Sequence, residues 1–226
     1  MDRIVEVYTG AYASGKSEIS INRAIMLHKE TDSPVILVDL DTVEPAYTLR
    51  PIKKEIEKYG VRVITQESYF GLGEAGNTIT GEQMNCLSNP GNIVIDVGYG
   101  VGGLDILEVI NGIDKEKNLK IYIVINTSKH ETLNVQDIID YVKWSAGTGD
   151  QEWKKFNGII SNAHYGDETT SEDVINGLRK IQKAAEELKI PIIALTVSEK
   201  LYPEFGADFE GIPVWSLKRF MPKALW

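Results

Sequence analysis

The sequence predicts an α/β fold in which a doubly wound, mostly parallel sheet carries helices on both faces. Apolar runs without polar alternation, as expected for strands covered on both faces, alternate along the chain with segments of helical period. Each connection between these runs is long enough for a right-handed crossover. With 42% hydrophobic residues, a chain of 226 residues can bury one sizeable core, so we expect residues 1–226 to form a single domain.

The expected strands are short apolar runs, most of which end in a polar residue. They comprise residues 4–8, 35–41, 61–65, 92–96, 121–125, 158–162 and 192–197, with an edge strand at 212–215. Helices are expected directly after the first strand, near Pro51, over 135–142, and after Thr170, which forms a capping box with Asp173. Residues 71–91 are rich in Gly and Asn and show no period, which indicates either a mobile switch or lid or an ordinary surface loop.

The segment from Gly10 to Ser17 has the spacing G-x-x-x-x-G-K-[ST] of a phosphate-binding loop. Gly10 and Gly15 allow the backbone to turn tightly, so that its N–H groups point at phosphate oxygens. Lys16 is placed to reach the β- and γ-phosphates and Ser17 to bind Mg²⁺, and the helix N-terminus adds its positive dipole end. The residues that we expect to bind the nucleotide here are Gly10, Ala13, Ser14, Gly15, Lys16, Ser17 and Glu18.

Polar residues stand at the ends of the strands that follow. Asp39 and Asp41 end the second strand, Asp96 ends a later one, and Asn126 and Asn162 end two more. In a doubly wound sheet the ligand binds outside the carboxyl ends of the strands, so all of these side chains are expected at the edge that carries the phosphate loop. Mg²⁺ bound to a triphosphate needs one or two carboxylates, although an acid at a strand end can also be a turn former.

Charge and cysteine content narrow the classes of function. The net charge of −9 argues against a broad nucleic-acid-binding face, although a local basic patch is left open. No apolar run is long enough to span a membrane, and the N-terminus has charged residues where a signal peptide needs an apolar core. The single Cys86 excludes an internal disulfide and favours a reducing compartment. We therefore expect a cytoplasmic protein.

Four segments in this order, GAYASGKS, VILVDLDTVEP, IVIDVGYG and GIISNAHYG, resemble the MinD/ParA–CobQ/CobB group of SIMIBI-class P-loop NTPases. The resemblance covers nearly the whole chain and, within the group, is greatest to small bacterial ATP-binding proteins of unassigned role. It implies that Lys16 and Ser17 bind phosphate and magnesium. It also implies that Asp41 positions the attacking water, that Asp39 supports the metal, and that Asp96 holds a magnesium-bound water.

The same resemblance assigns roles to the rest of the sheet edge. Residues 98–103 would form a switch that senses the γ-phosphate, Asn162 would read the edge of adenine, and residues 196–203 would cover the base. One position departs from the group, in which a second lysine follows the first glycine of the loop and reaches the nucleotide of a partner subunit. Here that position is Ala11, so a dimer activated by that lysine is not expected, whereas a dimer through other contacts is left open.

The identity of the base and the type of reaction are predicted from sequence patterns that the chain lacks. Guanine readout usually uses N-K-x-D after a strand, which the segment from Asn126 to Lys129 lacks, so we favour ATP with Mg²⁺ over GTP. The first function to consider is a slow ATPase that switches a partner protein, a metalloenzyme or its own homodimer. The alternative is a small-molecule ligase or kinase like dethiobiotin synthetase. The first is favoured because no polar cluster dedicated to a second substrate stands out.

Overall fold

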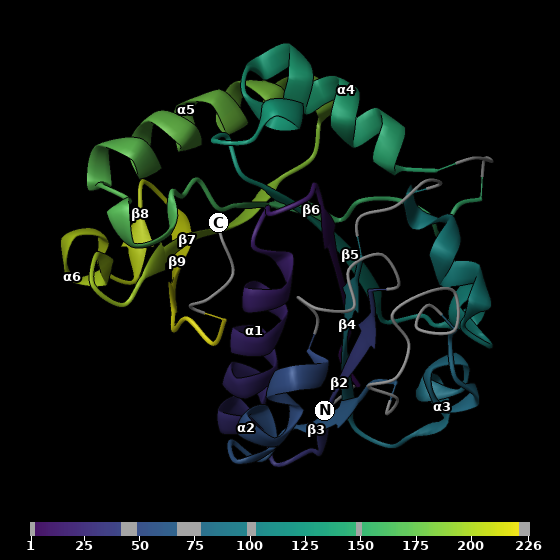
Figure 1. Ribbon diagram of the computed structural model, residues 1–226. Helices are drawn as coiled ribbons and strands as arrows, with labels where there is room; N and C mark the ends of the chain where they lie inside the picture. The colour runs from purple at the N-terminus through teal and green to yellow at the C-terminus, as the bar shows by residue number, and fades with distance from the viewer. Residues whose placement is uncertain (1–2, 42–48, 67–77, 99–102, 148–150, 222–226) are drawn as a thin grey trace.

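The computed structural model describes residues 3–41, 49–66, 78–98, 103–147 and 151–221. Within these ranges, nine strands form one sheet in the order β3-β2-β4-β1-β5-β6-β7-β9-β8 (Figure 1). All neighbouring strands are parallel except β8 and β9. The strands are β1 Val5–Gly10, β2 Val35–Leu40, β3 Arg62–Ile64, β4 Asn92–Val97, β5 Leu119–Ile125, β6 Gly158–Ser161, β7 Ile192–Ser198, β8 Asp208–Phe209 and β9 Ile212–Leu217. The predicted mostly parallel sheet is confirmed.

The sheet is covered on both faces, which explains why its central strands lack polar alternation. Every residue of β1, β2 and β4 is buried. The expected edge strand lies inside the sheet instead, because β9 pairs with β7 on one side and with the short β8 on the other. The helices are α1 Lys16–Glu30, α2 Lys53–Glu57, α3 Gly81–Met84, α4 Val135–Ser145, α5 Ser171–Leu188 and α6 Tyr202–Phe205.

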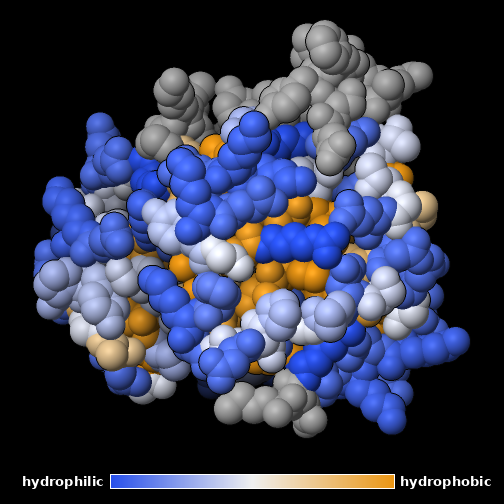
Figure 2. Space-filling view, turned by 90° about the horizontal axis from the view of Figure 1, so that it is seen from below, coloured by the Kyte–Doolittle hydropathy of each residue, from blue (hydrophilic) through white to orange (hydrophobic). Residues whose placement is uncertain are grey.

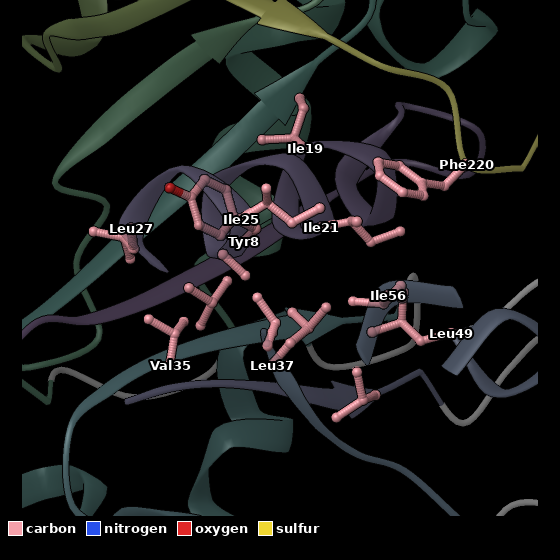
Figure 3. Close-up of a cluster of buried hydrophobic side chains, with 14 of the residues drawn as sticks. Tyr8, Ile19, Ile21, Ile25, Leu27, Val35, Leu37, Leu49, Ile56 and Phe220 are labelled. Carbon is pink, nitrogen blue, oxygen red and sulfur yellow. The ribbon is translucent and has the colours of Figure 1, made fainter. Parts of the chain in front are cut away.

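Helices α1 and α2 cover one face. Between them and the sheet lies a hydrophobic cluster that includes Tyr8, Ile21, Leu37 and Ile56, and Phe220 from the far end of the chain packs into it (Figure 3). On the other face, α4 and α5 lie side by side in Figure 1 and pack on β5, β6 and β7. Helix α1 thus packs on the sheet and contacts the C-terminal segment, and residues 11–15 connect it to β1.

Residues 78–91 differ from the prediction of a switch, lid or surface loop. They contain α3 and a 3₁₀ turn over Cys86–Ser88, while residues 71–77 lie outside the described ranges. Thr80 and Gln83 form a capping box at the start of α3, a T-x-x-Q signal that was present in the sequence. Gln83 is buried, and its side-chain amide donates a hydrogen bond to the backbone oxygen of Asp39. This part of the segment is therefore fixed to the sheet beside β2.

One face of the molecule presents a hydrophobic area among hydrophilic side chains (Figure 2). Seen from below Figure 1, hydrophilic side chains surround a central area of hydrophobic residues (Figure 2). Among the described residues, the large hydrophobic side chains that are exposed are Tyr12, Leu133, Trp144 and Tyr165. None of the helices in the described ranges is long and apolar enough to cross a membrane.

Candidate functional site

The predicted phosphate loop connects β1 to α1. Ala13 and Gly15 both have left-handed backbone conformations, with φ of 54° and 87°. A Cβ on Gly10 would lie 2.5 Å from Ser14 Oγ and 2.6 Å from the backbone oxygen of Val124, so this position admits only glycine. The chain therefore turns back on itself between Gly10 and Lys16, the first residue of α1, as the motif requires.

Lys16 and the three predicted acids lie together at this edge of the sheet. Lys16 Nζ is 3.6 Å from Asp41 Oδ2, and both side chains are nearly buried. The backbone N–H of Asp41 donates to Asp39 Oδ1 at 3.0 Å. Because β2 and β4 are neighbours in register, Asp39 also stands beside Asp96. The two strand-end segments that the sequence singled out are thus adjacent in space.

Burial makes this group of acids electrostatically unfavourable. Burial, followed by the charge of Asp96, raises the pKa of Asp39 to about 7. Burial raises the pKa of Asp96 to about 6, although the Lys16 charge and hydrogen bonds from Ser17 and Ser20 act in the opposite direction. Two carboxylates that cannot easily be charged together favour a cation nearby.

Several buried polar atoms around the phosphate loop have no hydrogen-bond partner among the described residues. They are Ser14 Oγ, Asp96 Oδ2 and His164 Nε2. Buried polar atoms of this kind are rare in folded proteins and call for a ligand, ion or water. Ser17 and Asp96 together fit a Mg²⁺ ion that takes its remaining ligands from phosphate and water. In the described ranges no three His, Cys, Asp or Glu side chains form a site for a metal by themselves.

A recess with about 620 Å³ of empty volume, part of it open to solvent, adjoins the phosphate loop. Its position at the ends of β6, β7 and β9 is where the sequence predicted a base. Of the predicted cover at 196–203, only residues 196–198 line it, while Leu201 packs in the core. The other lining residues are Gly15, Glu18, Asn162, Ala163, His164, Gly166, Thr169, Val174, Leu217, Lys218, Arg219 and Met221.

Asn162, predicted to read adenine, is buried at the end of β6 and already holds two protein groups. Its Nδ2 donates to the backbone oxygen of Ser14 at 2.7 Å, and its Oδ1 accepts from Thr196 Oγ1 at 2.6 Å. A Cβ on Gly15 would lie 2.3 Å from the same Nδ2. Asn162 thus fastens the phosphate loop to β7 from the side of the recess.

Glu18 lies on the first turn of α1 and contacts the far end of the chain. Its carboxylate accepts hydrogen bonds from the backbone N–H groups of Phe220 and Met221, at 2.7 to 3.0 Å. One turn later, Asn22 donates to the backbone oxygen of Lys218 and accepts from its N–H, at 2.8 and 3.0 Å. The segment Lys218–Met221 is therefore attached to α1 and contributes to the wall of the recess, a role that sequence reasoning missed.

Asn126, at the end of β5, joins three loops. Its Oδ1 accepts hydrogen bonds from the N–H groups of Ser128 and His164, at 3.1 and 3.0 Å. Its Nδ2 donates to the backbone oxygens of His164 and Ala13, at 3.2 and 3.4 Å. The sequence placed Asn126 at this edge but gave it no role, because its partners are 38 and 113 residues away or lie in a local turn.

The predicted switch at 98–103 lies mostly outside the described ranges, since 99–102 are not included. Gly98, its first residue, packs against Asp41. A Cβ there would lie 2.4 Å from Asp41 Oδ1. The segment that follows β4 therefore starts in contact with the carboxylate nearest to Lys16.

No protein-family model and no curated protein matches the sequence. Among solved structures, the chain is similar to FtsY of Thermotoga maritima, with a TM-score of 0.54, 18% identity, and coverage of 99% of this chain and 67% of that one. For FtsY of Mycoplasma mycoides the TM-score is 0.55 and the identity 15%, over 85% of this chain and 60% of that one. A third similar structure is the signal recognition particle receptor FtsY of Elizabethkingia anophelis in complex with GDP. Its TM-score is 0.54 and its identity 14%, over 85% of this chain and 57% of that one.

These similarities concern the fold. The alignments span between 57% and 67% of the length of these three FtsY chains. At such low identities a shared architecture does not carry over a substrate or a partner. The chain has the fold of the SIMIBI-class P-loop NTPases, as the order of its motifs predicted.

Proposed function

We propose that this protein binds Mg²⁺ and ATP at the phosphate loop, hydrolyses the nucleotide slowly, and acts as a switch on a partner protein. The observation that carries the proposal is the position of Lys16. Lys16 is the first residue of α1 and follows the left-handed Ala13 and Gly15. It is nearly buried, lies 3.6 Å from Asp41, and is next in sequence to Gly15, which lines the recess. A buried ammonium at a helix N-terminus is a phosphate-binding arrangement.

In this proposal the residues of the loop bind and orient the triphosphate. The backbone N–H groups from Gly10 to Ser17 and the Lys16 ammonium hold the phosphate oxygens. The Ser17 hydroxyl would bind Mg²⁺, and Asp96 and Asp39 would support the metal. Bound Mg²⁺ would supply charge neutralisation on the β- and γ-phosphate oxygens. Catalysis would then consist of positioning and electrostatics, with Asp41 orienting the attacking water.

The proposed switch begins at the contact between Lys16 and Asp41. A γ-phosphate competes with Asp41 for the Lys16 ammonium, because both are anions within reach of the same cation. A movement of the Asp41 side chain would displace Gly98, because Gly98 packs on that carboxylate. Gly98 is the first residue of the segment that follows β4. Nucleotide state and the conformation of that segment are thereby coupled.

Adenine is proposed over guanine on the chemistry of the recess. Guanine offers two neighbouring donors, N1–H and the 2-amino group, which proteins commonly bind with a carboxylate. Glu18 is the carboxylate that lines the recess in the described ranges, and its oxygens already accept the N–H groups of Phe220 and Met221. The Elizabethkingia FtsY structure contains GDP, so the fold by itself does not choose the base.

The partner is proposed to be another protein, or a second copy of this chain through contacts other than the phosphate loop. Ala11 is 1% exposed and packs in the cluster that includes Ile123, Ile139 and Ile159. A side chain at this position points into the core and would not reach a nucleotide in another subunit. Of the loop residues, Tyr12 is the exposed hydrophobic one.

The first experiment is calorimetric titration with ATP and with GTP, each with Mg²⁺, alongside the mass from light scattering. We expect ATP to bind more tightly than GTP and Lys16→Ala to bind neither. Equal binding by wild type and Lys16→Ala would refute the proposal. Phosphate release should occur without an added substrate. Release only when a carboxylic acid is added would favour an enzyme like dethiobiotin synthetase instead.

A further inference from the structure

The imidazole of His164 lines the recess next to the phosphate loop, and its surroundings fix which nitrogen carries the proton. Nδ1 accepts a hydrogen bond from the backbone N–H of Gly166 at 3.2 Å. A backbone N–H can only donate, so Nδ1 is unprotonated and the neutral ring carries its proton on Nε2. Burial, followed by the charges of Lys129 and Arg219, lowers the pKa of His164 to about 4. The ring is therefore neutral near pH 7.

The backbone of His164 is held firmly in place. Its N–H donates to Asn126 Oδ1 at 3.0 Å, and its oxygen accepts from Asn126 Nδ2 at 3.2 Å and from Ser128 Oγ at 2.7 Å. Three hydrogen bonds thus hold the backbone of His164, and the Gly166 bond orients its ring. The direction of its remaining donor is thus set before any ligand binds.

That remaining donor, Nε2–H, is buried and has no hydrogen-bond partner among the described residues. It faces the phosphate loop, because a Cβ on Gly15 would lie 3.2 Å from it. The charges of Lys129 and Arg219 both act on the ring, and Arg219 pairs with Asp167 at 2.6 Å. The positive charge of Lys129 therefore favours an anion as the missing acceptor. An unsatisfied buried donor in such a place calls for a ligand.

We propose that His164 Nε2–H donates a hydrogen bond to a phosphate oxygen of the bound nucleotide, the phosphate that adjoins the ribose. This proposal rests on the nucleotide-binding function proposed above. A phosphate chain that extends from Lys16 toward the recess has to pass Gly15, the residue that Nε2 faces. His164 would then bind the part of the nucleotide that ATP, ADP and AMP share, and would contribute affinity without sensing the γ-phosphate.

Two substitutions separate the donor from the structural role of the ring. In His164→Asn the side-chain oxygen can still accept from Gly166, as Nδ1 does, but no group replaces Nε2–H. In His164→Gln the amide nitrogen reaches the place of Nε2 and keeps the donor. We expect His164→Asn to bind ATP and ADP on the order of tenfold to a hundredfold more weakly than wild type. His164→Gln should restore most of the affinity, and His28→Asn, at the exposed far end of α1, should match wild type.

The outcomes distinguish this inference from the function on which it rests. If wild type and Lys16→Ala bind ATP equally, the proposed function fails. If Lys16→Ala loses binding but His164→Asn binds like wild type, only the role of His164 fails. Equal losses for His164→Asn and His164→Gln would also overturn it. Unfolding temperatures without nucleotide establish that each variant is folded.

Two further measurements identify the acceptor and the donor. With 2′,3′-dideoxy-ATP, the loss caused by His164→Asn should be as large as with ATP, whereas its disappearance would assign the bond to a ribose hydroxyl and overturn the proposal. The chain has three histidines, so nitrogen-15 spectra of labelled histidine are simple to assign with His164→Asn. We expect an Nε2–H tautomer whose proton signal shifts when ADP is added. An Nδ1–H tautomer, or an unchanged signal at saturation, would contradict the proposal.

Discussion

The ammonium of Lys16 lies 3.6 Å from the carboxylate of Asp41, and both groups are nearly buried. The residue that the motif assigns to phosphate therefore has an anionic partner within the protein. A nucleotide has to compete with this ion pair, so the two residues connect binding with the conformation of the sheet edge. A substitution of Lys16 should therefore affect nucleotide binding, whereas a substitution of Asp41 should affect hydrolysis.

Asp41→Asn removes the competing charge and keeps the size of the side chain. We expect ATP to bind at least as tightly as to wild type, because Lys16 is released for phosphate, while hydrolysis slows by about a hundredfold through loss of the oriented water. Calorimetry and phosphate release measure the two effects separately. A loss of binding as complete as in Lys16→Ala would show that Asp41 is part of the binding site instead.

Gly15→Ala should disrupt the loop through both its backbone and its neighbour. Gly15 has φ of 87°, and a Cβ there would lie 2.3 Å from Asn162 Nδ2. Gly112 is a matched control, since its φ is 83° but no atom lies within 4 Å of its Cβ. Both changes incur the left-handed penalty of about 1–2 kcal/mol, but Gly15→Ala should unfold at a lower denaturant concentration than Gly112→Ala and should also lose ATP binding. Equal stability losses in the two variants would contradict the predicted collision.

Asp39→Asn should stabilise the nucleotide-free protein at alkaline pH. The pKa of Asp39 is raised to about 7 in the folded protein, against about 3.9 for an unfolded chain. Between these values the folded state binds more protons, so the contribution of Asp39 to stability falls as the pH rises. The variant should gain up to a few kcal/mol over wild type at pH 8 and almost nothing at pH 4. Chemical denaturation at both pH values measures the difference, with the exposed Asp114→Asn as the control.

Glu18→Gln should loosen the C-terminal segment. The carboxylate accepts the N–H groups of Phe220 and Met221, whereas a glutamine side chain presents one oxygen and two donors. We expect faster hydrogen exchange at these two amides and a several-fold weaker affinity for ATP, since the segment lines the recess. Glu30→Gln, at the other end of α1, should change neither measurement. Unchanged exchange at Phe220 would refute the attachment.

Cys86 should resist thiol reagents in the folded protein. The side chain is buried among hydrophobic residues, and burial raises its pKa to about 11. At pH 8 only about one thiol in a thousand is then the reactive thiolate, and the reagent cannot reach it. We expect no labelling over an hour under native conditions and one equivalent per chain in denaturant. Fast native labelling would mean that the turn after α3 opens.

The parts of the site that the sequence could predict are those encoded locally. The loop from Gly10 to Ser17 and the acids at the ends of β2 and β4 could be assigned because each motif lies within a few residues and follows a recognisable strand. The sheet order could not be derived in this way, yet the rule for carboxyl ends still placed these residues at one edge.

The parts that were missed depend on contacts between distant segments. The hydrogen bond between Glu18 and Phe220 joins residues that are 202 positions apart, and no local sequence pattern in either segment predicts it. Asn126 looked like one more polar strand end until its partners were known. The error at 81–88 is different in kind, because the capping box of Thr80 and Gln83 was readable but was outweighed by the surrounding glycines and asparagines.

The attachment of Lys218–Met221 to α1 has a consequence for biosynthesis. During translation, helix α1 and the phosphate loop leave the ribosome some 200 positions before the residues that complete the recess. A nascent chain can form the loop earlier but cannot complete the recess until residue 221 has been added. In a series of ribosome-bound chains of increasing length, nucleotide binding should therefore begin only once the chain includes residue 221.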